Sequence, residues 1–225
     1  MTHFPLDSIE IETGPNPTVA VIWMHGLGAD GNDFVPIVKE LELMGCPPIR
    51  FIFPHAPTMP VTINNGYVMR AWYDILGTDL VKREDEAGLR KSQFAVEQLI
   101  NRQKSLGIPA NRTILAGFSQ GCAMALQTGL RYPETLAGLL CLSGYVPLHT
   151  HLASERHPAN QATPIFLAHG RGDPVIPFAR AEQSRDLLIA LGYAVEWHDY
   201  PMQHSVCPQE VDDIGNWFRT LLRST

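Results

Sequence analysis

The chain has 225 residues, of which 45% are hydrophobic and 18% are charged, and its formal net charge at pH 7 is −6. This composition predicts a single globular domain over residues 1–225 with a large core, and the lack of a basic run argues against nucleic acid as a partner. We find neither a membrane-spanning apolar run nor a secretory signal, so we expect a cytoplasmic protein without stable membrane insertion.

The cysteines and histidines of the chain show no metal-binding spacing. The four cysteines are widely scattered, as expected of free thiols in a reducing compartment. The nine histidines form neither an H-E-x-x-H motif nor a cluster with cysteines. We therefore expect no metal site.

Two apolar runs near the start of the chain, residues 18–24 and 49–53, are typical of strands buried on both faces. The first run ends in H-G-L-G at residues 25–28, which does not fit the phosphate-binding loop motifs. This segment is either a plain turn or a hydrolase-type loop that contributes a backbone N–H to an oxyanion hole. Apolar residues at helical spacing predict a helix over residues 34–43.

Residues 55–86 have no regular pattern, yet they contain many apolar side chains. A disordered segment would contain few of them. We expect a loop at about residues 56–85 that covers a binding groove, and the alternative is an excursion that packs onto the core.

The segment at residues 113–124, T-I-L-A-G-F-S-Q-G-C-A-M, joins an apolar run, the pattern G-x-S-x-G and a helix-like run. A serine at such a turn has a strained backbone, so Gly117 and Gly121 must be small. The helix that follows directs free N–H groups toward the serine, where an oxyanion would form. We interpret Ser119 as a nucleophile, and the alternative is that so short a pattern arises by chance.

Further strands are expected over residues 136–142, 164–168 and 194–200, and further helices over residues 86–106, 178–191 and 210–222. Residues 149–161 are polar and predict a surface loop. The alternation of strands and helices predicts an α/β fold, with a mostly parallel sheet covered by helices on both faces. In such sheets functional residues gather at the carboxyl ends of the strands.

Three residues that follow strands can form a catalytic triad. Ser119 needs a base within hydrogen-bond reach, and that base needs a carboxylate that fixes its tautomer. His204 is the candidate base and Asp173 the candidate acid, because the order serine, aspartate, histidine is that of α/β-hydrolases. Among the competing histidines, His198 lies within a strand, and His25 and His169 precede glycines at strand ends and are expected to shape loops. His55 comes too early in the chain for this order. The competing carboxylates are Asp186 and Asp199. Asp173 could alternatively serve only to cap the following helix.

Six motifs occur in order along the chain: W-M-H-G-L-G-A-D-G (residues 23–31), A-P-T-x-P-V-T-I-N-x-G (56–66), A-W-Y-D-I (71–75), A-G-F-S-Q-G (116–121), H-G-x-x-D-P-V-I-P (169–177) and Y-P-M-x-H (200–204). Together they resemble the carboxylesterase/acyl-protein thioesterase (phospholipase/carboxylesterase) family, and its bacterial carboxylesterase branch most closely. The resemblance covers nearly the whole chain.

This resemblance implies an α/β-hydrolase fold, no metal and no organic cofactor. It places the nucleophile at Ser119, the acid at Asp173 and the base at His204, with the oxyanion-hole amides at Leu27 and Gln120. Dimers occur among members of the family, so a homodimer is an expected assembly. Trp72 falls in the substrate-covering loop of the family. We expect the substrate to contact five apolar side chains: Met59, Ile63, Tyr67, Trp72 and Val175.

Two residues depart from the pattern of the family, which usually has glycine at both positions. Cys122 follows the G-F-S-Q-G motif, and we expect its small thiol to be tolerated with tighter packing. Gln203 precedes the candidate base, and it would be strained if the family's glycine there had a positive φ. Its side chain would also narrow the mouth of the pocket.

The sequence therefore predicts a serine hydrolase that cleaves carboxylic esters of short to medium acyl chains through an acyl-enzyme on Ser119. The substrate would be a small ester or a lipid-like molecule. A lysophospholipase or an acyl-protein thioesterase is the alternative within the same class. A non-catalytic protein that binds an acyl ligand is the alternative from another class.

Overall fold

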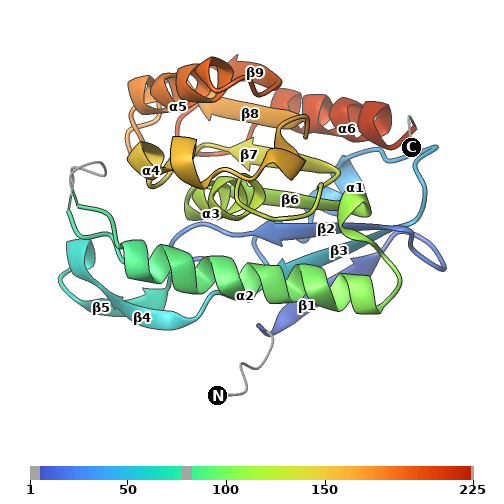
Figure 1. Ribbon diagram of the computed structural model, residues 1–225, viewed down its shortest axis with the longest axis horizontal. Coiled ribbons are helices and arrows are strands. Elements are labelled where there is room, and N and C mark those ends of the chain that lie inside the picture. Colours follow the sequence, from blue (N-terminus) through green and yellow to red (C-terminus); the bar gives the residue numbers. More distant parts are fainter. Residues whose placement is uncertain (1–5, 78–82, 224–225) are drawn as a thin grey trace.

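The computed structural model describes residues 6–77 and 83–223 (Figure 1). Seven strands form the central sheet: β1 (Ser8–Glu12), β2 (Val19–Met24), β3 (Ile49–Pro54), β6 (Thr113–Phe118), β7 (Gly138–Leu142), β8 (Ile165–Gly170) and β9 (Val195–Tyr200). Their order is β1-β3-β2-β6-β7-β8-β9, and every neighbouring pair is parallel except the antiparallel pair of β1 and β3. The mostly parallel α/β sheet predicted from the sequence is confirmed.

Helices cover both faces of the sheet. One face packs against α2 (Glu86–Ser105), α3 (Gln120–Gly129) and α5 (Phe178–Ala190), and the other packs against α1 (Ile37–Glu40) and α6 (Pro208–Arg223). Alternate residues of β2 enter the two cores, so that Ile22 packs on the first face and Trp23 on the second. A strand between two cores has no polar face, which explains why its sequence is continuously apolar.

A hairpin occupies much of the segment that was expected to be an irregular loop. It consists of β4 (Thr58–Val61) and β5 (Tyr67–Arg70), which pair antiparallel. Residues 62–66 join the two strands, and they form a 3-10 turn at Thr62–Asn64 followed by Asn65 and Gly66 with φ values of 55° and 75°, a left-handed backbone that asparagine and glycine tolerate. Residues 78–82 of the expected loop lie outside the described residues.

Three other local predictions are corrected. The helix expected over residues 34–43 is reduced to α1, because Pro36 lacks an N–H group and disfavours helical backbone at the preceding Val35. The surface loop expected over residues 149–161 contains α4 (His149–Glu155), whose Leu152 is buried in the core. Strand β1 was not predicted, because it is short and its burial alternates.

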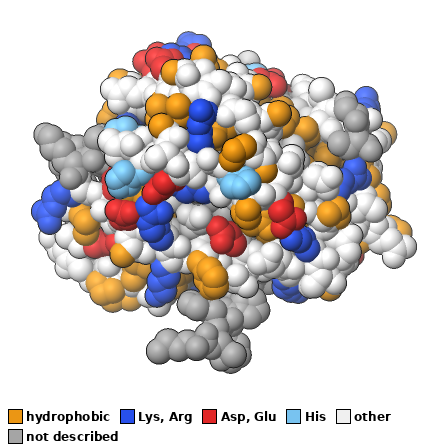
Figure 2. Space-filling view, viewed as in Figure 1, with side chains coloured by type: hydrophobic (Ala, Val, Ile, Leu, Met, Phe, Trp, Pro, Cys, Tyr) orange, Lys and Arg blue, Asp and Glu red, His pale blue; other side chains and the backbone are white. Residues whose placement is uncertain are grey.

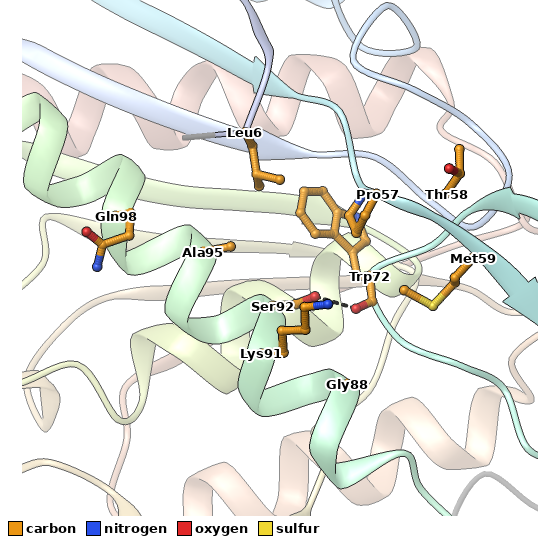
Figure 3. A pocket seen from close by; sticks show the side chains of 10 residues that line it. All are labelled: Leu6, Pro57, Thr58, Met59, Trp72, Gly88, Lys91, Ser92, Ala95 and Gln98. Carbon is orange, nitrogen blue, oxygen red and sulfur yellow. Dashed lines mark hydrogen bonds between the residues drawn. The ribbon is translucent and has the colours of Figure 1, made fainter. Parts of the chain in front are cut away.

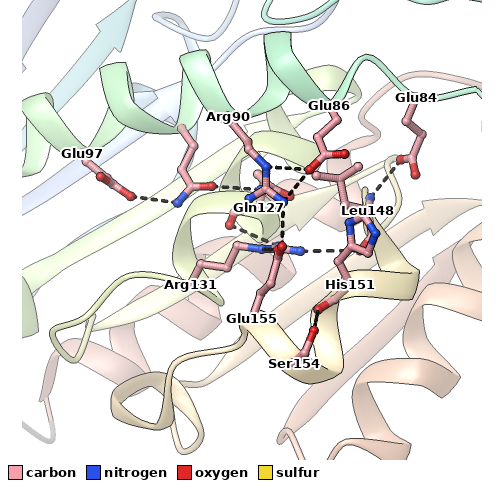
Figure 4. Close-up of polar contacts among 11 residues, drawn as sticks. Glu84, Glu86, Arg90, Glu97, Gln127, Arg131, Leu148, His151, Ser154 and Glu155 are labelled. Atoms are coloured by element: carbon pink, nitrogen blue, oxygen red, sulfur yellow. Dashed lines mark hydrogen bonds and ion pairs between the residues drawn. The ribbon is translucent and has the colours of Figure 1, made fainter.

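An ion-pair network ties α4 to α2 and to the end of α3 (Figure 4). The Glu155 carboxylate accepts hydrogen bonds from Arg90 Nη2 at 2.6 Å and from Arg131 Nε at 2.7 Å. The Arg131 side chain is only 4% exposed, and a charge so buried needs such a partner. Glu84 accepts from the backbone N–H of Leu148 at 3.0 Å, where α4 begins. The network therefore anchors the segment between β7 and α4.

The surface mixes charges of both signs. Acidic and basic side chains are interspersed with apolar ones in Figure 2, without a large area of one charge among the described residues of that face. Within residues 6–77 and 83–223, no helix has the length and the apolar character needed to cross a bilayer.

Candidate active site

Ser119 stands at the sharp turn between β6 and α3. Its backbone has φ 57° and ψ −116°, a strained conformation for a residue with a side chain. A Cβ atom on Gly117 would lie 2.2 Å from the carbonyl carbon of Gly121, and one on Gly121 would lie 2.0 Å from the backbone oxygen of Met24. The turn can therefore form only with glycine at both positions, in agreement with the reasoning from the sequence.

The loops after β8 and β9 bring two further side chains to Ser119. His204 Nε2 lies 2.9 Å from Ser119 Oγ, and His204 Nδ1 lies 2.6 Å from Asp173 Oδ2. Asp173 Oδ1 accepts the backbone N–H groups of Val175 and Ile176 at 2.8 and 2.9 Å. With its proton on Nδ1, His204 donates to Asp173 and leaves Nε2 free to accept the serine proton. This is the arrangement that activates a serine hydroxyl.

His169, a competing histidine, lies beside the candidate acid instead of the candidate nucleophile. Its Nε2 is 2.9 Å from the backbone oxygen of Ile176 and 3.3 Å from Asp173 Oδ2. The ring is fully buried, and burial lowers the pKa of His169. It is thus held as a neutral imidazole that packs against the Asp173 carboxyl.

The loop after β2 brings the backbone of Leu27 to the same place. Leu27 and Ser119 line one cavity, and a Cβ atom on Gly26 would lie 3.3 Å from Ser119 Cβ. The backbone N–H groups of Leu27 and Gln120 donate to no backbone oxygen of the described residues. Two such free N–H groups beside a serine suit the binding of an oxyanion.

The imidazole of His25 orients the first of these groups. His25 Nδ1 donates to the Gly26 carbonyl at 2.7 Å, and its Nε2 accepts the backbone N–H of Ala56 at 3.0 Å. Burial lowers the pKa of His25 and keeps this neutral tautomer. Because the Gly26 carbonyl and the Leu27 N–H belong to one planar peptide group, a fixed carbonyl also fixes the N–H.

Trp72 connects the two segments that carry these N–H groups. Its indole Nε1 donates to the backbone oxygen of His25 at 2.9 Å, and its backbone N–H donates to Gln120 Oε1 at 3.0 Å. Gln120 Nε2 donates in turn to the backbone oxygen of Tyr73 at 2.9 Å. The Ser92 hydroxyl donates to the Trp72 carbonyl. Trp72 is 1% exposed, so these hydrogen bonds are shielded from water.

A cavity of about 470 Å³ opens in front of Ser119. Its apolar and aromatic lining includes Leu27, Ile63, Tyr73, Ile75, Tyr145 and Val175. The structure therefore places two of the five expected substrate contacts, Ile63 and Val175, at this cavity.

The other three expected contacts lie elsewhere. Trp72 and Met59 line a different cavity, and the Trp72 indole lies beside the His25 ring, with 5.4 Å between the ring centres. Tyr67 is 70% exposed on the edge of the β4–β5 hairpin. The sequence reasoning missed Tyr73 and Tyr145, whose hydroxyl groups are 3.0 Å apart in the Ser119 cavity. For Tyr73, the only sequence signal for a place at this cavity is its position directly after Trp72 in the motif A-W-Y-D-I.

Both departures from the family pattern are accommodated. Cys122 is buried against Gly144, where a Cβ atom would lie 2.4 Å from the Cys122 sulfur. Gln203 does not have a positive φ, it is exposed, and it does not line the Ser119 cavity. The strain and the narrowing considered for Gln203 are therefore absent.

Residues 7–222 match the sequence profile of a family described as Phospholipase/Carboxylesterase. The acyl-protein thioesterase 1 of Yarrowia lipolytica is 39% identical over 218 residues, which cover 95% of this chain and 96% of the relative. That of Neurospora crassa is 41% identical over 209 residues, with coverages of 89% and 85%.

Solved structures show the same likeness. The crystal structure of Arabidopsis thaliana SOBER1 superposes with a TM-score of 0.84 at 30% identity, covering 91% of this chain and 99% of that one. Zea mays acyl-protein thioesterase 2 has a TM-score of 0.81 at 27% identity, with coverages of 96% and 99%. The Bacillus cereus carboxylesterase, at 19% identity, covers 95% of this chain and 94% of that one with a TM-score of 0.76 and supports the fold alone.

Proposed function

The chain belongs to the phospholipase/carboxylesterase family of α/β-hydrolases, and we propose that it is a thioesterase that removes acyl groups from proteins or peptides. The observation that carries this proposal is the hydrogen-bonded series Ser119–His204–Asp173 at the mouth of an apolar cavity. Relatives named acyl-protein thioesterase favour thioesters over the general carboxylic esters that the sequence reasoning put first.

The proposed reaction passes through an acyl-enzyme. His204 takes the Ser119 proton as the serine oxygen attacks the acyl carbonyl, and the N–H groups of Leu27 and Gln120 hold the oxyanion. Each such donor contributes about 3 kcal/mol to transition-state stabilisation in comparable sites. His204 then gives the proton to the leaving sulfur, and a water molecule activated by His204 releases the acid. Asp173 stabilises the imidazolium that forms in both steps.

The cavity supports an acyl chain as the bound group. Ile63, Ile75 and Val175 offer an apolar lining, and its volume of about 470 Å³ lies within the range of small-molecule pockets. None of the described residues that line it is charged, so an acyl chain that enters it desolvates no described charged group.

Two peptides that differ in one atom test the proposal. One carries S-octanoyl cysteine and the other O-octanoyl serine in the same sequence. We expect the wild type to hydrolyse the thioester with the higher kcat/KM, and Ser119→Ala to lower this value at least about 10³-fold. Ser154→Ala, on the surface of α4, is the matched control and should retain activity.

Three outcomes contradict the proposal in different ways. Faster hydrolysis of the serine ester would identify a general carboxylesterase. Full activity of Ser119→Ala would remove Ser119 from the mechanism. Saturable binding of both peptides without hydrolysis would identify a binding protein.

A further inference from the structure

A second cavity, of about 300 Å³, lies between the β4–β5 hairpin and α2 (Figure 3). Trp72 lines this cavity, whereas the next residue, Tyr73, lines the cavity of Ser119. The Gln120 side chain binds the backbone of both residues. The two cavities are thus separated by one short piece of chain that is hydrogen-bonded to a residue of the candidate oxyanion hole.

The second cavity combines an apolar lining with one positive charge. Its apolar side chains are Leu6, Pro57, Met59, Trp72 and Ala95. Lys91 lines it and is exposed, it forms no ion pair with a described residue, and none of the described residues that line the cavity is acidic. A ligand that fits this lining has an apolar chain and an anionic head, and the volume limits it to a small molecule.

We propose that the second cavity binds a medium-chain carboxylic acid, with its alkyl chain against Trp72 and its carboxylate near Lys91, and that the bound acid stabilises the oxyanion hole. The choice of a carboxylic acid as the natural ligand rests on the proposed function, because such an acid is the product of acyl hydrolysis. The cavity itself and its charge are independent of that function.

The hydrogen bonds of Trp72 provide the coupling. The indole N–H holds the carbonyl of His25, which precedes the Gly26–Leu27 peptide, and the backbone N–H holds Gln120. Trp72 is 1% exposed, so the ligand contacts only the part of the residue that lines the cavity, and these contacts add to the hydrogen bonds that hold this conformation. Because a ligand favours the state that it binds, the acid favours the conformation in which the N–H groups of Leu27 and Gln120 face Ser119.

Binding is tested with 8-bromooctanoate, whose bromine quenches the fluorescence of a tryptophan that it touches. We expect saturable quenching of the wild type that is lost in Trp72→Phe and in Ala95→Phe, which fills the cavity. Ala87→Phe adds the same ring to an exposed position of α2 outside the cavity and should retain the quenching. Lys91→Gln should weaken binding about two- to fivefold, as expected for an exposed ion pair.

The site is refuted if Ala95→Phe is quenched as strongly as the wild type, or if Trp72→Phe loses none of the quenching. An affinity of Lys91→Gln equal to that of the wild type would refute the placement of the carboxylate. None of these measurements requires turnover, so they stand whether or not the chain is a thioesterase.

Coupling is tested through kcat. At saturating p-nitrophenyl butyrate, competition at the Ser119 cavity is suppressed, and we expect octanoate to raise kcat about fivefold, the lower end of typical couplings. Ala95→Phe should abolish the increase, and Ala87→Phe should keep it. If kcat of the wild type does not respond to octanoate, the coupling to the oxyanion hole is wrong. If the ester is not hydrolysed at all, the proposed function fails instead.

Discussion

Replacing Trp72 by phenylalanine should lower kcat without raising KM. The phenyl ring keeps most of the apolar contact, but it has no N–H to donate to the His25 carbonyl, which the indole contacts at 2.9 Å. Complete loss of one oxyanion donor costs about 10²–10³-fold in kcat. Since Trp72→Phe loosens the Leu27 donor without removing it, we expect a decrease of about 10–100-fold, or about 1.4–2.7 kcal/mol.

The variant should nevertheless remain folded. An unsatisfied buried carbonyl costs about 1–3 kcal/mol, which is less than the usual stability of a domain. KM should not change, because Trp72 does not line the cavity of Ser119. The assay is steady-state hydrolysis of p-nitrophenyl butyrate, with urea unfolding of the same preparations.

Trp23→Phe provides the matched control. Trp23 is also 1% exposed, and it lies on β2 just before the same loop. Its indole N–H has no hydrogen-bond partner among the described residues, so the substitution removes ring area alone. Equal values of kcat for the two variants would show that the Trp72 N–H does not position the oxyanion hole. A higher KM with unchanged kcat for Trp72→Phe would instead indicate that Trp72 contacts the substrate, as expected from the sequence.

Three further substitutions test other parts of the structure. Gly121→Ala should cost about 3 kcal/mol of stability and most of the activity, because the added Cβ would meet a backbone oxygen of β2. Gly14→Ala is the control, because its Cβ would make only ordinary contacts, and thermal unfolding should show a melting temperature close to that of the wild type. Burial raises the pKa of Glu210 to about 8, above its ordinary value of 4.5. The native state therefore binds the carboxyl proton of Glu210 more tightly than the unfolded state does. As a result, the free energy of unfolding should fall as the pH rises from 4.5 to about 8. Urea unfolding at pH 5 and pH 8 should show that Glu210→Gln reduces this fall, and an unchanged pH dependence would contradict the assignment. Glu155→Gln should lower the free energy of unfolding by about 1–3 kcal/mol, because it leaves the buried Arg131 guanidinium without its counter-charge, and kcat should not change.

The sequence predicts the sheet well, because buried parallel strands such as β2 are apolar on both faces and are separated by amphipathic helices. The turn at Ser119 is predictable for a similar reason, since its glycines are required by close backbone contacts that a short motif encodes. The order of Ser119, Asp173 and His204 follows from the order of the strands, and the structure places their side chains within hydrogen-bond distance.

The direction of individual side chains is harder to predict. Trp72 and Tyr73 are adjacent and aromatic, yet they line different cavities. Hydrogen bonds between distant segments hold the two rings, from the Trp72 indole to His25 and between the Tyr73 and Tyr145 hydroxyl groups, and the sequence does not indicate these pairings. Strand β1 was missed because an edge strand with one exposed face lacks a continuous apolar run. The hairpin was missed because Pro57 and Pro60 interrupt the strand pattern and because five residues, 62–66, join its strands instead of a two-residue turn.

The contact between Cys122 and Gly144 also restricts how this sequence can evolve. A side chain at position 144 would meet both the sulfur and the Cβ of Cys122, at 2.4 and 2.5 Å, so the thiol is compatible only with glycine there. Reversion of Cys122 to the glycine common in the family would relieve these two contacts, but a Cβ atom at position 144 would still lie 2.9 Å from the backbone oxygen of Ser119. The turn of the candidate nucleophile thus also constrains position 144. We therefore expect glycine to persist there whichever residue occupies position 122.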